Sequence, residues 1–454
     1  MSAPTDDPFP AGGASHSPYE PPVTDLALPV DAAQSPVPPS DPAIAARNIR
    51  AFLLFRVLFN SRFYYPIYTI LFLDFGLTLE QFAILNLVWA GSIVLFEVPS
   101  GALADKLGRK HLVVFSGVLM IIEMLLLCFM PVNAGLVTFY LFLGNRVISG
   151  LAEACCSGAD EALVYDALPV EGRSAAWTRV LASLMRWQSM TFMVVALIGA
   201  AVYSRDFMNR IPGLEHLSKE ACMRIPLWLN LGMAVATVAV SLLFVDTHPR
   251  SPDRSSLRSV VKASFGQMIG TGRWIMSSPA AVVLILTGLL YDSFTRLFYS
   301  IGSSYYRLLQ IDESCNGVIL AGSSLIGLGT ALVVEKLVGI LKPSQNLGMV
   351  AVLVFAGLSG IALQIQAWAG WAGVLFVVPF WLAMRSLHYF LSQYLNSISD
   401  SAHRATVLSF KGLTMNLAYG LVMWLYGLQT AWLRSEHAPA LAKLSKEDTD
   451  VKLL

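Results

Sequence analysis

The sequence has 454 residues, of which 55% are hydrophobic and only 13% are charged, and its mean hydropathy is +0.60. A water-soluble protein of this length needs more charged groups to keep its surface in water. The composition therefore excludes a large soluble domain, and with a net charge of +1 we expect no nucleic-acid partner. We predict an all-α integral membrane protein, in which runs of about 20 apolar residues cross the hydrocarbon core as helices.

The first 46 residues are rich in Pro, Ala, Ser and Asp, and the first basic residue is Arg47. A secretory signal needs a basic start followed by an apolar core, and this segment has neither. It contains too little apolar surface to offset the entropy that ordering would cost. We therefore predict a disordered tail over residues 1–46.

Apolar runs separated by polar loops predict eleven membrane spans in two groups. We expect an N-terminal six-helix bundle over 47–245, a linker over 246–279, a C-terminal bundle of about five helices over 280–434, and a polar tail over 435–454. Within the linker, residues 257–276 form either a basic amphipathic helix on the membrane surface or a plain solvated segment. The predicted spans are 49–73, 80–102, 111–130, 134–157, 176–203, 226–245, 280–302, 317–339, 346–367, 370–395 and 405–431.

Lysine and arginine concentrate in alternate loops. The loop at 106–110 and the linker at 246–279 are basic, whereas the loops at 74–80 and 131–135 have no Lys or Arg. Basic loops stay on the cytoplasmic side of a membrane. We therefore expect the basic loops, the linker and the N-terminal tail in the cytoplasm.

The five cysteines are scattered and show no metal-ligand spacing. Cys222 and Cys315 both fall in loops that we place outside, where two free thiols are favoured and a disulfide is the alternative. The sequence has no phosphate-binding loop of the type Gly-x-x-x-x-Gly-Lys-Ser/Thr. It also lacks a catalytic arrangement of Ser or Cys. We expect a protein that is not an enzyme and that uses neither a cofactor nor a metal.

Residues 101–110 read Gly-Ala-Leu-Ala-Asp-Lys-Leu-Gly-Arg-Lys and join two apolar runs through a tight basic turn. Gly101 and Gly108 permit close helix approach and a tight turn, while Arg109 and Lys110 fix the topology. The pattern Gly-x-x-x-Asp-x-x-Gly-Arg-Lys resembles the signature of the major facilitator superfamily, in the loop between its second and third helices. The neighbouring residues resemble a prokaryotic branch whose members mostly have no assigned substrate.

This resemblance implies the major facilitator fold and a secondary transporter in a bacterial inner membrane. It also implies that Asp105 contacts the N-terminus of the helix that begins near 405–406, where the partial positive charge of a helix lies. The contact would latch the two bundles on the inside while the outer side is open. Twelve helices are usual in the superfamily, but the residues after 435 are too polar to span a membrane. We expect an incomplete chain, and the alternative is a second bundle without its last helix.

The segment Arg-Val-Ile-Ser-Gly that starts at Arg146 resembles the superfamily's Arg-x-x-x-Gly element, which is associated with proton transfer in drug exporters. Ser149 stands where glutamine is usual. Glu153 lies two helical turns from Arg146 on the same face, and a carboxylate beside an arginine can bind or release a proton as its surroundings change. Asp292 and Arg296 are spaced i, i+4 and can pair along one helix. We predict proton coupling through Arg146, Glu153 and Asp292, and structural ion pairs are the alternative.

Charged side chains at mid-membrane depth cost at least ~2.5–3.5 kcal/mol each, so they face a wet cavity or a partner. In the superfamily, helices 1, 4, 7 and 10 line the cavity, which implies the substrate-cavity residues Arg56, Asn60, Arg296, Arg385 and His388. Arginines outnumber carboxylates in this part of the sequence, which favours an anionic or amphiphilic small molecule. Other charged or polar residues at this depth are Arg62, Glu97, Glu123, Arg186 and Gln188.

The expected protein is a monomeric secondary active transporter that moves a small solute across the cell membrane by alternating access, coupled to protons and surrounded by lipid. Two alternatives stay open. One is a permease for drug or metabolite efflux, and the other is a membrane scaffold or sensor that kept the fold without transporting anything.

Overall fold

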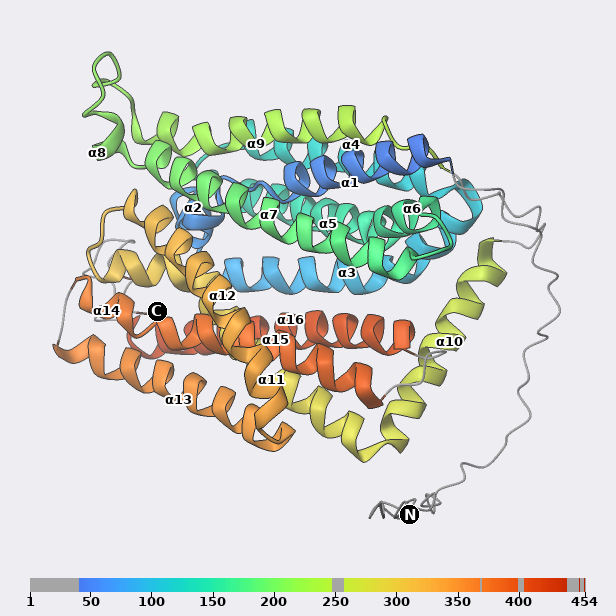
Figure 1. Ribbon diagram of the computed structural model, residues 1–454. Coiled ribbons are helices and arrows are strands. Elements are labelled where there is room, and N and C mark those ends of the chain that lie inside the picture. Colours follow the sequence, from blue (N-terminus) through green and yellow to red (C-terminus); the bar gives the residue numbers. More distant parts are fainter. Residues whose placement is uncertain are drawn as a thin grey trace, which may run out of the picture. The chain divides into compact units, whose positions relative to one another are not determined.

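The computed structural model describes residues 41–246, 257–367, 370–398 and 404–438, together with residues 449 and 453. Within these ranges the chain forms helices and contains no strand, as the sequence predicts (Figure 1). Most of the predicted tail at 1–46, and most of the polar tail at 435–454, lies outside the described residues.

The first helix begins earlier than predicted. α1 (Pro42–Asn60) starts inside the segment that was expected to be tail. Asp41 is the N-cap residue, and its carboxylate accepts a hydrogen bond of 2.8 Å from the N–H of Ala43. Pro42 suits the first helical position because the N–H that it lacks would have no partner there. The structure thus moves the end of the tail from residue 46 to residue 41.

The predicted span at 49–73 is not one continuous helix. Pro66 has no N–H to donate to a preceding helical turn. The N–H of Phe63 leaves the helical pattern and donates to Oδ1 of Asn230, at 2.8 Å. α7 also lies close to this segment at Gly199, where an added Cβ would overlap the carbonyl oxygen of Phe63. Irregular backbone at membrane depth needs such partners, since lipid offers none. The pieces that follow α1 are η1 (Tyr65–Ile67) and α2 (Tyr68–Asp74).

We call α1 to α9 the first helix group. Its longest members match the predicted spans, and α3 begins with a capping box between Thr78 and Gln81. Residues 159–167, which we expected to be a loop, form a short helix instead. The remaining helices are α3 (Leu79–Leu107), α4 (Arg109–Cys128), α5 (Leu136–Cys156), α6 (Ala159–Ala167), α7 (Arg173–Tyr203), α8 (Arg205–Met208) and α9 (Lys219–Ser241).

We call α11 to α16 the second helix group. It follows α10 (Leu257–Ser277), so the second part of the predicted linker is helical. Seven helices among the described residues are long and apolar enough to cross a membrane. The other predicted spans, which correspond to α1 with α2, α5, α12 and α16, are also helical. The helices of the second group are α11 (Pro279–Leu308), α12 (Cys315–Ile340), α13 (Pro343–Ala367), α14 (Ala372–Leu375), α15 (Val378–Ile398) and α16 (Arg404–Glu436).

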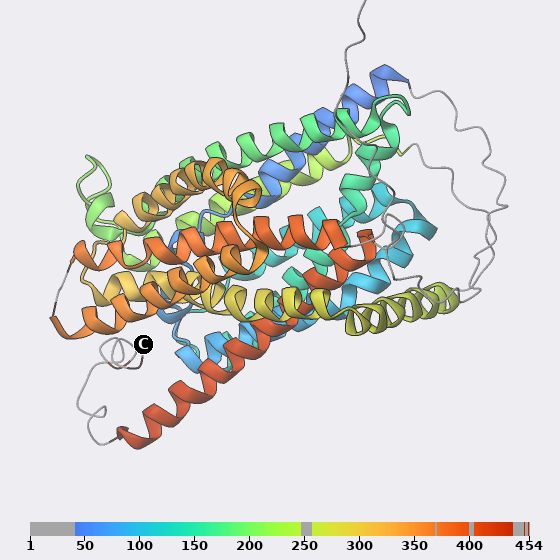
Figure 2. The same ribbon diagram turned by 60° about the horizontal axis from the view of Figure 1, so that its bottom comes forward.

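The described residues form a first core, in the first group, that also includes Tyr419 and Met423 of α16, and a second core almost entirely within the second group. Phe52, Phe72 and Phe142 are buried in the first core, and Phe380 and Phe390 in the second. α16 lies along α3 (Figure 2). α7 and η1 contact α12, and α2 contacts α11. α16 of the second group thus packs against the first group along much of its length.

We expect Gly199→Ala to lower the melting temperature of the purified protein, because the added methyl group would meet the backbone of the unwound segment. Overpacking of this kind costs about 1–3 kcal/mol. Thermal unfolding in detergent, followed by tryptophan fluorescence, measures the effect. Gly144→Ala is the matched control, since no atom lies within 4 Å of a Cβ at that position. Equal melting temperatures for the two variants would contradict this account of the break.

Candidate functional site

The helix bundle has two ends that carry different chemistry. The Asp74 end is the end at which α2 stops and α3 starts. The Gly108 end is the opposite end, at which α3 stops and α4 starts.

A cluster of charged side chains joins the two groups at the Asp74 end. Arg307 of α11 donates two hydrogen bonds to Asp74 of α2, at 2.8 and 3.0 Å, and a third to Glu313 at 2.6 Å. Lys219 of α9 pairs with Glu313 and lies 3.5 Å from Asp74, and the hydroxyl of Tyr203 donates to Asp74. The fork of Arg307 fits a carboxylate through two parallel bonds, which are among the stronger contacts in proteins. We name these five residues the Asp74 cluster.

Further contacts close the same end. Arg434 of α16 donates to Glu80 of α3 at 2.8 Å, and Ser204 donates to Asp312 at 3.2 Å. Glycine also lets the groups approach, because a Cβ at Gly317 of α12 would overlap the backbone of α7. The two helix groups are therefore held together at the Asp74 end.

The charge state of Asp74 follows from its partners. Burial by itself would raise the pKa of Asp74, but the hydrogen bonds and charge of Arg307, with Lys219 and Tyr203, hold this pKa below its ordinary value. A lowered pKa means that the stabilisation is fully present above the ordinary value of about 4 and is lost only as the pH falls through the lowered value. The Asp74 cluster consequently stays intact across the neutral range.

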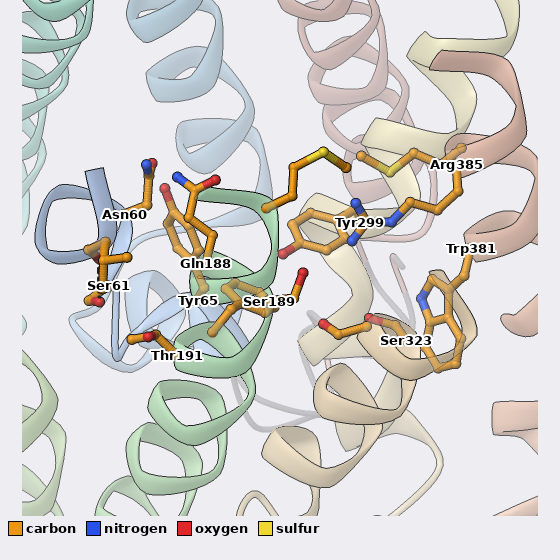
Figure 3. Close-up of a pocket in the computed structure, with 15 residues that line it drawn as sticks. Asn60, Ser61, Tyr65, Gln188, Ser189, Thr191, Tyr299, Ser323, Trp381 and Arg385 are labelled. Atoms are coloured by element: carbon orange, nitrogen blue, oxygen red, sulfur yellow. Dashed lines mark hydrogen bonds between the residues drawn. The ribbon is translucent and has the colours of Figure 1, made fainter. Parts of the chain in front are cut away.

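A cavity of about 400 Å³ lies between the groups. Its walls come from α1, η1 and α7 on one side and from α11, α12 and α15 on the other. Figure 3 shows Asn60 and Gln188 on the side of the first group, with Tyr299, Trp381 and Arg385 on the side of the second. Two predicted cavity residues, Asn60 and Arg385, thus line it. The volume falls within the range of roughly 300–1,000 Å³ that is usual for small-molecule sites.

The other predicted cavity residues take part in ion pairs instead of lining this cavity. Arg56 binds Asp160 of α6, with one hydrogen bond of 2.8 Å. Arg296 and His388 both bind Asp292, at 2.9 and 3.1 Å. Asp292 is almost fully buried and Lys411 of α16 interacts with it electrostatically.

The predicted residue Arg146 is buried, but its carboxylate neighbour is Glu123 and not Glu153. Glu123 of α4 lies 3.4 Å from Arg62 and 3.6 Å from Arg146, and no water reaches it. Glu153 interacts electrostatically with Arg56. A spacing of seven residues on one helix cannot reveal a partner on another helix. The sequence points to Glu123 as a charge at membrane depth, since it is the one carboxylate in the apolar run 111–130, but not to its pairing with Arg146.

Hydrogen bonds connect the surroundings of Glu123 with the second group. Arg146 donates to the hydroxyl of Tyr68 at 3.1 Å, and this hydroxyl donates to Oδ1 of Asn86 at 2.9 Å. The same oxygen accepts a bond of 3.2 Å from Tyr419 of α16. The Tyr419 ring lies under the guanidinium group of Arg296, 5.3 Å away. Arg296 in turn pairs with Asp292. We name this series from Glu123 to Asp292 the polar chain.

The signature loop forms the turn at the Gly108 end. Gly108 has a φ of 97°, a conformation that favours glycine. Arg109 pairs with Asp166 of α6, and Lys110 donates to the carbonyl of Leu242 at 3.0 Å. Gly101 has open space around it and so does not serve close helix packing; it lines a second cavity of about 420 Å³. The predicted contact of the Asp105 side chain lies outside what the structure describes.

Neither a disulfide nor a metal-ligand cluster is present among the described residues. All five cysteines are free, so Cys222 and Cys315 do not form a bridge. No three His, Cys, Asp or Glu side chains of the described residues gather as a metal site would require.

The fold and the cavity define a multi-pass helical membrane protein with a solute-sized space between two helix groups. The chain belongs to the Major Facilitator Superfamily, whose family model matches residues 51–423. No curated protein matches.

Solved structures of transporters share the fold. A bacterial homologue of the human lysosomal transporter Spinster, in an inward-facing and unoccupied conformation, has a TM-score of 0.67 at 16% identity, covering 90% of this chain and 88% of that one. The nucleoside transporter NupG has a TM-score of 0.63 at 11% identity, covering 90% and 95%. A D-xylose–proton symporter has a TM-score of 0.57 at 13% identity, covering 90% and 95%.

We expect Asp74→Asn to open the Asp74 end, because the substitution removes the charge that holds Arg307 and Lys219. A cysteine introduced at Ser304 reports the opening. Ser304 lies on the face of α11 that carries Ser300 and Arg307, is buried, and has no hydrogen-bond partner among the described residues. In a background without native cysteines, maleimide should modify it about tenfold faster or more, equivalent to roughly 1.4 kcal/mol.

Asp206→Asn is the control for this experiment. It makes the same change on an exposed carboxylate of α8, also near the Asp74 end. If both variants left the modification rate unchanged, the Asp74 cluster would not be what closes this end.

Proposed function

We propose that this protein is a secondary active transporter that moves a small solute across the cell membrane by alternating access. The observation that carries the proposal is the cavity of about 400 Å³, walled by both helix groups, beside an end that ion pairs hold shut. A site near the middle of the bundle, with one closed end, suits a protein whose halves rock about a fixed solute. The assignment is transport and not catalysis.

The rocking parts would be the two predicted bundles, at 47–245 and 280–434, joined by the linker at 246–279. The second core, which lies within residues 275–415, supports this division, whereas α16 also packs into the first core. The basic helix α10 would lie on the membrane surface beside the Gly108 end. It contributes Ser264 and Met268 to the second cavity.

The Gly108 end would close in the opposite state. In the proposal, Asp105 then accepts hydrogen bonds from the start of α16, where the helix dipole is positive. The packing of α16 along α3 supports this, because it brings the two helices together. Arg109 and Asp166 would stay paired within the first group and support the loop.

Protons are the coupling ion that the structure supports best, and Asp292 is the group that would bind them. Its carboxylate sits between Arg296 and His388, near Lys411. His388 is partly exposed, so it offers a route for a proton to the buried acid. Arg146 and Glu123 at the other end of the polar chain would respond to the charge of Asp292 through Tyr419 and Asn86.

The orientation of the chain is also part of the proposal. The basic residues of the signature loop and α10 put the Gly108 end in the cytoplasm by the positive-inside rule, and we propose a bacterial inner membrane as the location. The sealed Asp74 end then faces outward, which makes this an inward-facing state.

Transport in proteoliposomes tests the proposal. Purified protein is first screened for thermal stabilisation against metabolites and amphiphiles, since a bound ligand stabilises by mass action. The stabilising compounds are then offered to proteoliposomes with and without an imposed pH gradient. We expect accumulation that requires the gradient and exchange that does not. The absence of any flux across the panel would favour a scaffold or sensor over a transporter.

We expect Asp292→Asn to reduce accumulation driven by the pH gradient about tenfold or more, because an amide cannot take up and release a proton. Exchange of solute across the membrane without a gradient should persist, since the variant leaves the cavity lining intact. Glu171→Gln, an exposed carboxylate between α6 and α7 at the Gly108 end, is the control. Full gradient-driven accumulation in Asp292→Asn would show that this acid is structural.

A further inference from the structure

The lining of the central cavity carries one formal charge. Arg385 is the only Lys, Arg, Asp, Glu or His among the described residues that line it. The other polar groups are amides and hydroxyls, with Asn60 and Gln188 facing the cavity from the first group and Ser323 and Ser324 from the second. The cavity is therefore a neutral polar and apolar surface with a single cation.

The state of Arg385 differs from that of three other arginines at this depth. Arg56, Arg146 and Arg296 each lie beside a carboxylate of the protein. Arg385 has no carboxylate partner among the described residues, and its side chain is exposed to the cavity. Gly327 of α12 leaves room for it, since a Cβ there would lie 3.0 Å from Nε of Arg385. Among the described residues, no side chain accepts a hydrogen bond from the guanidinium group of Arg385.

The remaining lining suits an apolar body. Tyr65, Tyr299 and Trp381 present aromatic rings, and Met185 and Met384 present flexible apolar side chains. Figure 3 shows Arg385 pointing from α15 toward Tyr299, so the cation and the aromatic surface lie side by side. Aromatic walls bind ring systems, and methionine adapts to different shapes.

We propose that the transported solute is an amphiphilic organic monoanion, with its acid group on Arg385 and its apolar body between Tyr299, Trp381 and Tyr65. This inference rests on the proposed transport function and names the solute class for the same cavity. Arginine binds a carboxylate, sulfonate or phosphate diester through two hydrogen bonds. An anion of this kind neutralises the one formal charge among the described residues of the lining.

The same lining disfavours the other classes of solute. An organic cation would meet Arg385 and find no carboxylate in the lining. A dianion would keep one charge uncompensated, which is costly at membrane depth. A sugar offers hydroxyl groups but no apolar body for the three aromatic rings. The single charge of the lining thus disfavours cations and dianions, and its aromatic walls disfavour sugars.

Matched probes that differ only in the head group test the proposal. The aryl set is naphthalene-2-acetate, its amide and 2-(2-naphthyl)ethylamine, and the alkyl set is decanoate, decanamide and decylamine. Isothermal titration calorimetry of the wild-type protein in lipid nanodiscs, with empty nanodiscs subtracted, gives the affinities. We expect at least one anion to bind at least tenfold more tightly than its amide and its amine.

Variants of Arg385 then assign the preference to this residue. Arg385→Gln should weaken binding of the anion by about ten- to hundredfold, the range for a hydrogen bond between charged groups, and should change binding of the amide less than threefold. Arg385→Lys should recover part of the loss, because it keeps the charge but not the fork. Arg186→Gln is the control, since it removes an exposed arginine of α7 that does not line the cavity.

Three results would overturn the inference: no anion of either set binds, an amide or amine binds as tightly as its anion, or Arg385→Gln leaves anion binding unchanged. These outcomes differ from a failure of the proposed function. Flux of a neutral solute in proteoliposomes would keep the transporter and remove the monoanion. Tight binding of the anion without any flux would keep the site and remove transport.

Discussion

The cost of charge inside a membrane is the constraint on which this structure depends. An unpaired charge at the bilayer centre costs several kcal/mol, about 3 kcal/mol even on insertion scales, and removing one partner of a buried pair costs roughly 3–5 kcal/mol. The protein meets this constraint with shared pairs. Glu123 serves two arginines, Arg62 and Arg146, and Asp292 serves Arg296 and His388. Because each acid has more than one basic partner, it can keep one ion pair when the other is broken, as the proposed coupling requires.

The polar chain joins these two acids across the boundary between the helix groups. Oδ1 of Asn86 accepts hydrogen bonds from Tyr68 of the first group and Tyr419 of the second. When the groups move apart, the bond from Tyr419 is the one that must break, and Asn86 can then serve Tyr68 alone. The charge of Asp292 and the position of Arg146 thus depend on the same relative movement. In the proposed mechanism this dependence is reciprocal, so a proton on one acid and the movement of the helices would influence each other equally.

Hydropathy and the signature loop were enough to predict the helices, the family and the turn at Gly108. Sequence reasoning did not find features that depend on contacts between helices. The interruption of the first span rests on Asn230 and Gly199, which lie far along the chain from Phe63. The pairing of Arg146 with Glu123 likewise joins α5 to α4. A search for charges also cannot find the cavity wall, because most of its members, such as Ser323, are uncharged.

In the proposed transporter, the guanidinium group of Arg385, the one charge in the described lining, would give the empty and the loaded cavity different energies. With no solute bound, Arg385 needs water around it, so closing the Gly108 end over an empty cavity would trap either a bare charge or its hydration. A bound monoanion replaces that water with a charge-assisted pair, and the loaded cavity is then neutral. The cost of closure falls only when the solute is present, as a transporter requires if it is not to change state while empty. The same reasoning accounts for the absence of a carboxylate from the described lining, where it would pair with Arg385 and remove the difference between the two states; Asp292 pairs with Arg296 outside this lining.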